Sequence, residues 1–132
     1  MEELLREIHN NQNLWIAHRL DKDTSGCLIV AKNKNVFDSF KTLFSAQGLN
    51  KKYLCLVSGK AKEKIFSCSN PIQHKKAVSH FKVLYQTDRH CFLEAHIETG
   101  RKHQIRKHLV ELGLPILGDK LYDKKNYSDE SK

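Results

Sequence analysis

The clearest apolar pattern along the chain is helical and lies at residues 35–48. Apolar residues recur there at the spacing of one helix face, namely Val36, Phe37, Phe40, Leu43 and Phe44. Asn33 or Asn35 is placed to cap the amino end, and Gly48 to end the helix. The opening residues 2–8 have the same spacing over a much shorter stretch. The pattern therefore predicts a long amphipathic helix preceded by a short one.

Two apolar runs predict buried strands. Residues 27–32, CLIVAK, are typical of a short buried strand. Residues 51–59, KKYLCLVSG, are apolar on both alternating faces, which predicts a central strand that includes Leu54 and Leu56.

Two further stretches, 77–86 and 90–98, alternate between apolar and polar residues. The first places Phe81, Val83 and Tyr85 on one side, and the second places Cys91, Leu93, Ala95 and Ile97 inward. Asp88 and Arg89 separate them, so we expect an antiparallel hairpin.

A second helix is predicted within residues 99–113, TGRKHQIRKHLVELG. Its apolar face consists of Ile105, Leu109 and Leu112, and Gly113 supplies the stop. Together these elements indicate an α+β fold, a mostly antiparallel mixed sheet with helices packed on it. We expect residues 1–132 to form one domain, with a polar tail that frays from about residue 123.

Composition and charge indicate a soluble globular protein and the kind of partner that it binds. The 132 residues are 39% hydrophobic and 29% charged, without an apolar run approaching the roughly 20 residues of a membrane helix. The first residues lack the apolar core of a signal peptide, so we expect a cytoplasmic protein. Its formal net charge of +8 favours a polyanionic partner. The four cysteines form no CxxC pair and are expected to be buried free thiols in a reducing compartment.

Residues 18–26, HRLDKDTSG, gather charge just before an apolar run. DKDTSG resembles the start of a calcium loop, but the twelfth position must be a bidentate carboxylate and is Lys32. We therefore expect no metal site. A solvated turn explains Asp23 through Gly26 well. It explains Arg19 and Asp21 less well, which leaves a catalytic carboxylate as the third interpretation.

Two residues elsewhere are candidate partners for such a carboxylate. Arg106 follows apolar Ile105 at the edge of the helix stripe, where an arginine is often an ion-pair partner or an anion ligand. Tyr53 lies in the strand at 51–59, where a tyrosine ordinarily fills core and hydrogen-bonds its hydroxyl. Taken singly, each residue is as well explained by an ordinary structural role.

Three linked motifs change that balance. HRLDKDTSG, KKYLCLV and TGRKHQIRKHLVELGLPILGDKLY follow one another between His18 and Tyr122. In order and spacing they resemble the RluA-type pseudouridine synthase family, whose motifs are HRLD-x-x-TSG, K-x-Y and GR-x-HQIR-x-H followed by GD-x-x-Y.

The resemblance implies a role for each matching residue. Asp21 is similar to the family's catalytic aspartate, Tyr53 to the tyrosine that stacks on the flipped base, and Arg106 to the arginine that pairs with the aspartate. Arg19 is similar to the arginine that enters the RNA stack. Further substrate-binding positions are implied within the same motifs: His18, Thr24, Arg101, His103 and Gln104.

The resemblance also implies the partners. The substrate is expected to be a uridine in structured RNA, ribosomal or transfer, and no cofactor is required because the uracil ring itself delocalises charge. Family catalytic domains have further strands on both sides of the motifs, so we expect an incomplete sheet whose exposed edge can pair with a second chain.

Two alternatives stay open. The chain can be a truncated RNA-binding module of the same fold that is catalytically weak or inactive. A more distant alternative is a hydrolase that uses Asp21 and Asp23 as paired carboxylates. Neither acid, however, has an apolar setting that would raise its pKa for acid catalysis.

Overall fold

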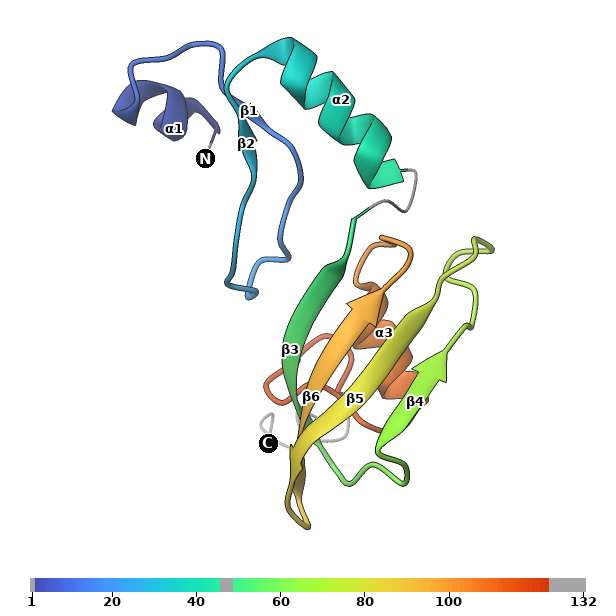
Figure 1. Cartoon of the computed structure of the whole chain (residues 1–132). Coiled ribbons are helices and arrows are strands. Elements are labelled where there is room, and N and C mark those ends of the chain that lie inside the picture. The colour runs from blue at the N-terminus through green and yellow to red at the C-terminus, as the bar shows by residue number, and fades with distance from the viewer. Residues whose placement is uncertain (1, 46–48, 124–132) are drawn as a thin grey trace. The chain divides into compact units, whose positions relative to one another are not determined.

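The computed structural model describes residues 2–45 and 49–123. The chain divides into two compact units, residues 1–49 and residues 50–132, and each is described here by itself. Figure 1 labels the helices and strands of both. No helix in the described ranges has the length and apolar character needed to cross a membrane.

The first unit combines helices with a short antiparallel ladder. In chain order its described elements are α1 (Glu2–Ile8), β1 (Trp15–Ile16), β2 (Val30–Ala31) and α2 (Lys34–Ser45). Trp15 lies opposite Ala31 in the ladder, and its ring contacts that of Phe37 on α2, with centroids 5.4 Å apart. This contact connects the ladder to the helix.

Both helices predicted for this unit are confirmed. The Asn33 side chain accepts a hydrogen bond from the Val36 N–H at 2.9 Å, so Asn33 is the cap. The predicted stop at Gly48 lies outside the described residues.

The prediction of a buried strand over CLIVAK is largely wrong. Only Val30 and Ala31 are in a strand, whereas Cys27 and Ile29 are exposed. The expectation that every cysteine is buried therefore fails at Cys27, although Cys55, Cys68 and Cys91 are buried free thiols.

The second unit is built on an antiparallel sheet, here called the main sheet, with strand order β3-β6-β5-β4 in the described residues. Its strands are β3 (Lys51–Ser58), β4 (Ile65–Cys68), β5 (Ser79–Gln86) and β6 (His90–Ile97). Strands β5 and β6 pair as the predicted hairpin. The inward residues of β6 are buried as predicted: Cys91, Leu93, Ala95 and Ile97.

Strand β3 is not central but stands at one end of the main sheet. Its residues Cys55 and Val57 are buried, whereas Leu54 and Leu56 are 65% and 45% exposed. Beyond β3, Ser58 and Leu117 donate backbone hydrogen bonds that join its carboxyl half to residues 115–117. The apolar residues on both faces of β3 therefore did not indicate that both faces are covered by other elements of the second unit.

A bulge corrects the prediction for β5. The register with β6 shifts between Val83 and Tyr85. Because alternation continues from a displaced start, Tyr85 leaves the face shared by Phe81 and Val83 and is 68% exposed.

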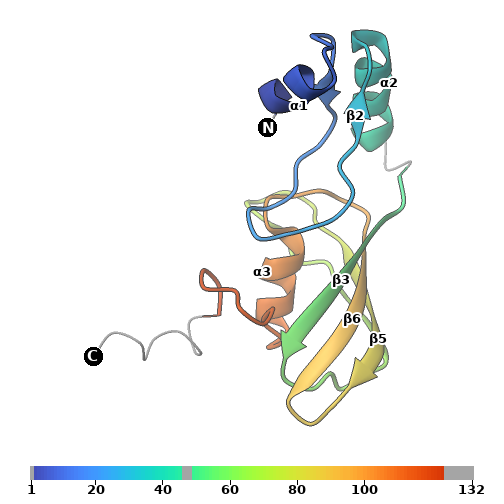
Figure 2. The same ribbon diagram turned by 90° about the vertical axis from the view of Figure 1, so that its left-hand side faces the viewer.

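Helix α3 (Gln104–Glu111) lies on one face of the main sheet (Figure 2). It begins later than the pattern suggested, so Arg101 and Lys102 belong to the turn before it. Leu109 is buried in the core shared with the sheet, and Ile105 packs against that core. Leu112, predicted on the same apolar face, is 41% exposed. Gly113 ends the helix with a positive φ of 73°.

Candidate active site

The HRLD motif, residues 18–21, lies in the loop that joins β1 to β2. Ala17 N–H donates to the Ile29 carbonyl at 2.9 Å, and Ile29 N–H donates to His18 Nε2 at 3.2 Å. The His18 ring also stacks on Phe44 of α2, with centroids 5.9 Å apart. His18 therefore anchors the base of the loop through its ring.

Within this loop a tight turn follows the candidate carboxylate. Thr24 N–H donates to the Asp21 carbonyl at 3.0 Å, which confirms the turn expected from the sequence. Asp21 is half-buried, and Arg19 and Thr24 are exposed. The loop thus displays the cation beside a partly sheltered carboxylate.

Tyr53 is positioned by the main sheet. It lies opposite Ala95 in the β3–β6 ladder and packs, half-buried, against the core cluster. A regular strand thus fixes where the Tyr53 backbone lies in the second unit.

Arg106 forms an ion pair with a carboxylate that the sequence interpretation did not assign. Its Nε and Nη2 donate to the two oxygens of Asp119, each at 2.7 Å. The side chains are 22% and 3% exposed. Such a bidentate pair fixes the plane of the guanidinium group.

Asp119 also organises the segment that follows it. Its Oδ1 accepts from the N–H groups of Leu121 and Tyr122, both at 3.1 Å. Burial by itself would raise the pKa of Asp119, but the hydrogen bonds from Arg106 and these two N–H groups outweigh it. They lower the pKa below its ordinary value of 3.8. Asp119 is therefore held as the anion.

Tyr122 connects the last motif to the helix motif. Its hydroxyl lies 2.9 Å from His103 Nδ1, and its ring lies under the Arg106 guanidinium, 4.9 Å from Cζ to centroid. Sequence reasoning does not single out Asp119 or Tyr122, although both belong to the GD-x-x-Y pattern.

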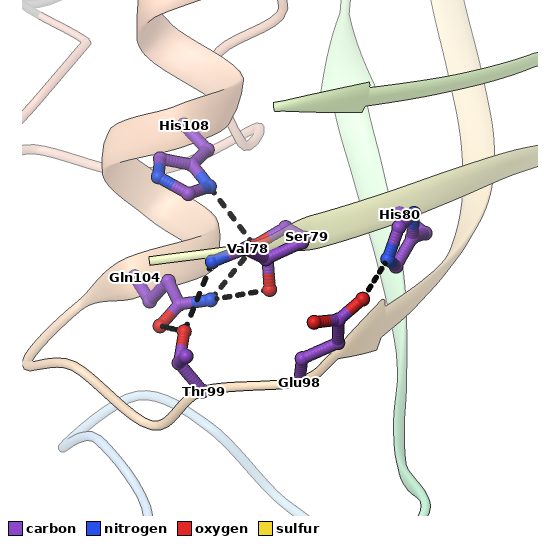
Figure 3. Close-up of polar contacts among 7 residues, drawn as sticks. All are labelled: Val78, Ser79, His80, Glu98, Thr99, Gln104 and His108. Atoms are coloured by element: carbon purple, nitrogen blue, oxygen red, sulfur yellow. Dashed lines mark hydrogen bonds and ion pairs between the residues drawn. The ribbon is translucent and has the colours of Figure 1, made fainter. Parts of the chain in front are cut away.

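The turn before α3 carries the other predicted residues. Arg101 Nε donates to the Lys76 carbonyl at 2.9 Å, and His103 adopts a left-handed conformation with φ of 55°. Gln104 is 3% exposed, and its amide group lies among polar atoms of the second unit (Figure 3).

The structure thus gathers the predicted residues into two groups. The β1–β2 loop of the first unit carries His18, Arg19, Asp21 and Thr24, and the second unit carries Tyr53, Arg101, His103, Gln104 and Arg106. The first group offers a carboxylate, and the second offers an aromatic ring and oriented cations.

The family model for RNA pseudouridylate synthases matches residues 2–111. Ribosomal large subunit pseudouridine synthase D of Buchnera aphidicola is 32% identical over 81% of this chain and 38% of its own length. The protein of the same name from Borreliella burgdorferi is 37% identical over 81% of this chain and 37% of its length.

A solved structure agrees. Human RNA Pseudouridylate Synthase Domain Containing 1 is 29% identical, with a TM-score of 0.77 over 89% of this chain and 58% of that one. This chain spans about two fifths or less of the curated relatives cited above. The chain belongs to the RNA pseudouridylate synthase family, a family of isomerases.

Proposed function

We propose that this chain carries the reaction centre of an RNA pseudouridine synthase that isomerises uridine in ribosomal or transfer RNA. The observation that carries the proposal is the family match over residues 2–111. That range contains the HRLD loop, the strand with Tyr53 and the helix with Arg106. One family thus accounts for three separated motifs.

The reaction needs a carboxylate aimed at the nucleotide. The bond from ribose C1′ to uracil N1 breaks, the base turns, and a new bond forms between uracil C5 and C1′. The proton on C5 then leaves, and N1 takes up a proton. In this proposal Asp21 acts as the ionised carboxylate, either as a nucleophile or by stabilising an oxocarbenium-like sugar. Tyr53 stacks on the uracil and is the candidate for proton transfer at C5. No cofactor is invoked.

Cations complete the centre in this proposal. An arginine close to a carboxylate favours its charged form, and we assign that role to Arg106, whose guanidinium is oriented by Asp119. Flipping the target base costs a few kcal/mol of stacking, and a side chain that fills the gap offsets part of it. The exposed Arg19 is assigned to that gap.

RNA binding draws on charge spread over the chain. The net charge of +8 attracts phosphates without regard to sequence. We assign further RNA contacts to His18, Thr24, Arg101 and His103. We also propose a cytoplasmic location, which suits the free thiols of the described residues.

A dimer through the main sheet is a further part of the proposal. The carboxyl half of β3 already bonds to residues 115–117. We therefore place the pairing edge at the amino half of β3, from Lys51 to Leu54, or at β4.

The proposal is tested by tritium release. The chain is incubated with ribosomal and transfer RNA that carries tritium at uridine C5, and both released tritium and pseudouridine in the digested RNA are measured. Release matched by pseudouridine supports the synthase. Retention of RNA on the chain without release favours the RNA-binding module. Release of free uracil or sugar would indicate the hydrolase instead.

A further inference from the structure

A chain of buried hydrogen bonds runs through the second unit behind the turn before α3 (Figure 3). Its side chains come from β5, from the segment between β6 and α3, and from α3 itself: Ser79, Thr99, Gln104 and His108. All are at most 7% exposed. The amide of Gln104 stands in the middle of this chain.

The Gln104 amide uses its full hydrogen-bonding capacity within the protein. Its Oε1 accepts from the Thr99 hydroxyl at 2.7 Å and from the Arg101 N–H at 3.0 Å. Its Nε2 donates to the Val78 carbonyl at 2.9 Å and to Ser79 Oγ at 3.0 Å. Two donors and two acceptor positions are all that a primary amide offers.

The directions of the other hydrogen bonds follow from the Asn70 carbonyl, where the series ends. His108 Nε2 lies 3.0 Å from the Asn70 carbonyl, which only accepts, so this nitrogen carries a proton. With a neutral His108 ring, Ser79 Oγ accepts from Gln104 and donates its proton to His108 Nδ1, 2.9 Å away. From the Arg101 N–H to the Asn70 carbonyl, every hydrogen bond of this series therefore points in the same donor-to-acceptor direction.

This series of hydrogen bonds begins at the turn that carries Arg101 and His103. His103 has φ of 55°, a conformation that a non-glycine residue keeps only where its surroundings hold it. Arg101, two residues earlier, is held twice, by its N–H to Gln104 and by its Nε to the Lys76 carbonyl. One of the contacts that hold the turn thus comes from the buried side chain of Gln104.

We propose that Gln104 is a positioning residue: it holds the turn from Thr99 to His103 so that Arg101 and His103 are presented to the RNA. This replaces the direct RNA contact expected for Gln104 from the sequence. The part that concerns RNA rests on the proposed function, whereas the part that concerns the turn does not.

The test compares two glutamines of the second unit in the full chain. Gln104→Met keeps the length of the side chain and removes its hydrogen bonds. Gln86→Met is the matched control, because Gln86 accepts from the Ala61 N–H at 2.9 Å, at a site away from the turn. Hydrogen exchange of single amides and affinity for a short uridine-containing hairpin RNA are measured for both.

For Gln104→Met we expect the Arg101 amide to exchange about tenfold faster and the Kd for RNA to rise about tenfold. Amides of β6, which report the stability of the whole unit, should exchange at equal rates in two variants of equal Tm. Gln86→Met should change neither the Arg101 amide nor RNA affinity, even where it lowers Tm equally. A role in general stability alone would affect both variants alike.

The Arg101 amide decides the proposal even if the wild-type chain does not bind RNA, which would count against the proposed function only. An unchanged exchange rate in Gln104→Met would overturn the positioning role. A faster rate with unchanged RNA affinity would overturn its link to RNA. Should Gln104→Met fail to fold, Thr99→Val removes one bond to Gln104 and is expected to act in the same direction, more weakly.

Discussion

The loop between β1 and β2 and the turn before α3 both carry motif residues, but they are supported very differently. The loop is closed by hydrogen bonds at its base and by one turn, and residues 22–27 within it are exposed. The turn rests on side chains that are buried and fully hydrogen-bonded. Chemistry placed on the loop is therefore separable from stability, whereas the turn couples the two.

The largest expected effect tests the loop. Asp21→Asn should abolish tritium release while RNA affinity changes by less than about twofold, because affinity comes mainly from distributed cations. Asp23→Asn, in the same loop and exposed, is the matched control and should retain activity. Wild-type release from Asp21→Asn would refute the assignment of the carboxylate.

The next effect tests the supported region through its ion pair. Arg106→Ala leaves Asp119 as a buried carboxylate without its bidentate partner. Breaking a fully buried pair costs about 3–5 kcal/mol, and we expect about 2–3 kcal/mol here because Arg106 is 22% exposed. Urea unfolding measures the loss, with Lys107→Ala as the control. Activity should fall as well, and a variant with unchanged stability would contradict the comparison between the two regions.

A smaller effect appears in acid. The pKa of Asp119 in the folded protein lies below its ordinary value. At any pH above that ordinary value, the carboxylate therefore stabilises the fold. This contribution is lost as the pH falls through the folded pKa. The Tm advantage of the wild type over Asp119→Asn should therefore stay constant from neutral pH down to about that ordinary value of 3.8 and shrink over the pH range below it. A constant difference across that range would show that the ion pair does not titrate as inferred.

The smallest effect distinguishes the two units by thiol chemistry. Cys27 of the loop is exposed, whereas Cys55, Cys68 and Cys91 are buried. Burial raises the pKa of Cys55 to about 11, which suppresses its thiolate. A thiol reagent such as DTNB should thus give a fast phase that disappears in Cys27→Ser. A fast phase that persists in that variant would mean that the second unit opens readily.

Much of the secondary structure followed from local pattern. The α2 helix and its Asn33 cap depend on neighbours within one turn, and the β5–β6 hairpin depends on a short connection and clean alternation in β6. The α+β class followed from these elements together. The motif residues could also be identified from the sequence, because a family resemblance rests on sequence motifs alone.

Tertiary structure decided which of the apolar strand residues became buried. Leu54 and Leu56 are as apolar as buried strand residues, yet they are exposed because β3 ends the main sheet and α3 covers the other face. The bulge that turns Tyr85 outward is a property of the pairing with β6.

The same holds for the polar residues. Nothing next to Arg106 in the chain shows that Asp119 is its partner. Nothing next to Gln104 shows that Val78 and Ser79 take both of its protons. Side-chain periodicity is fixed by the local backbone, but burial and hydrogen-bond partners are fixed by segments that meet only when the chain has folded.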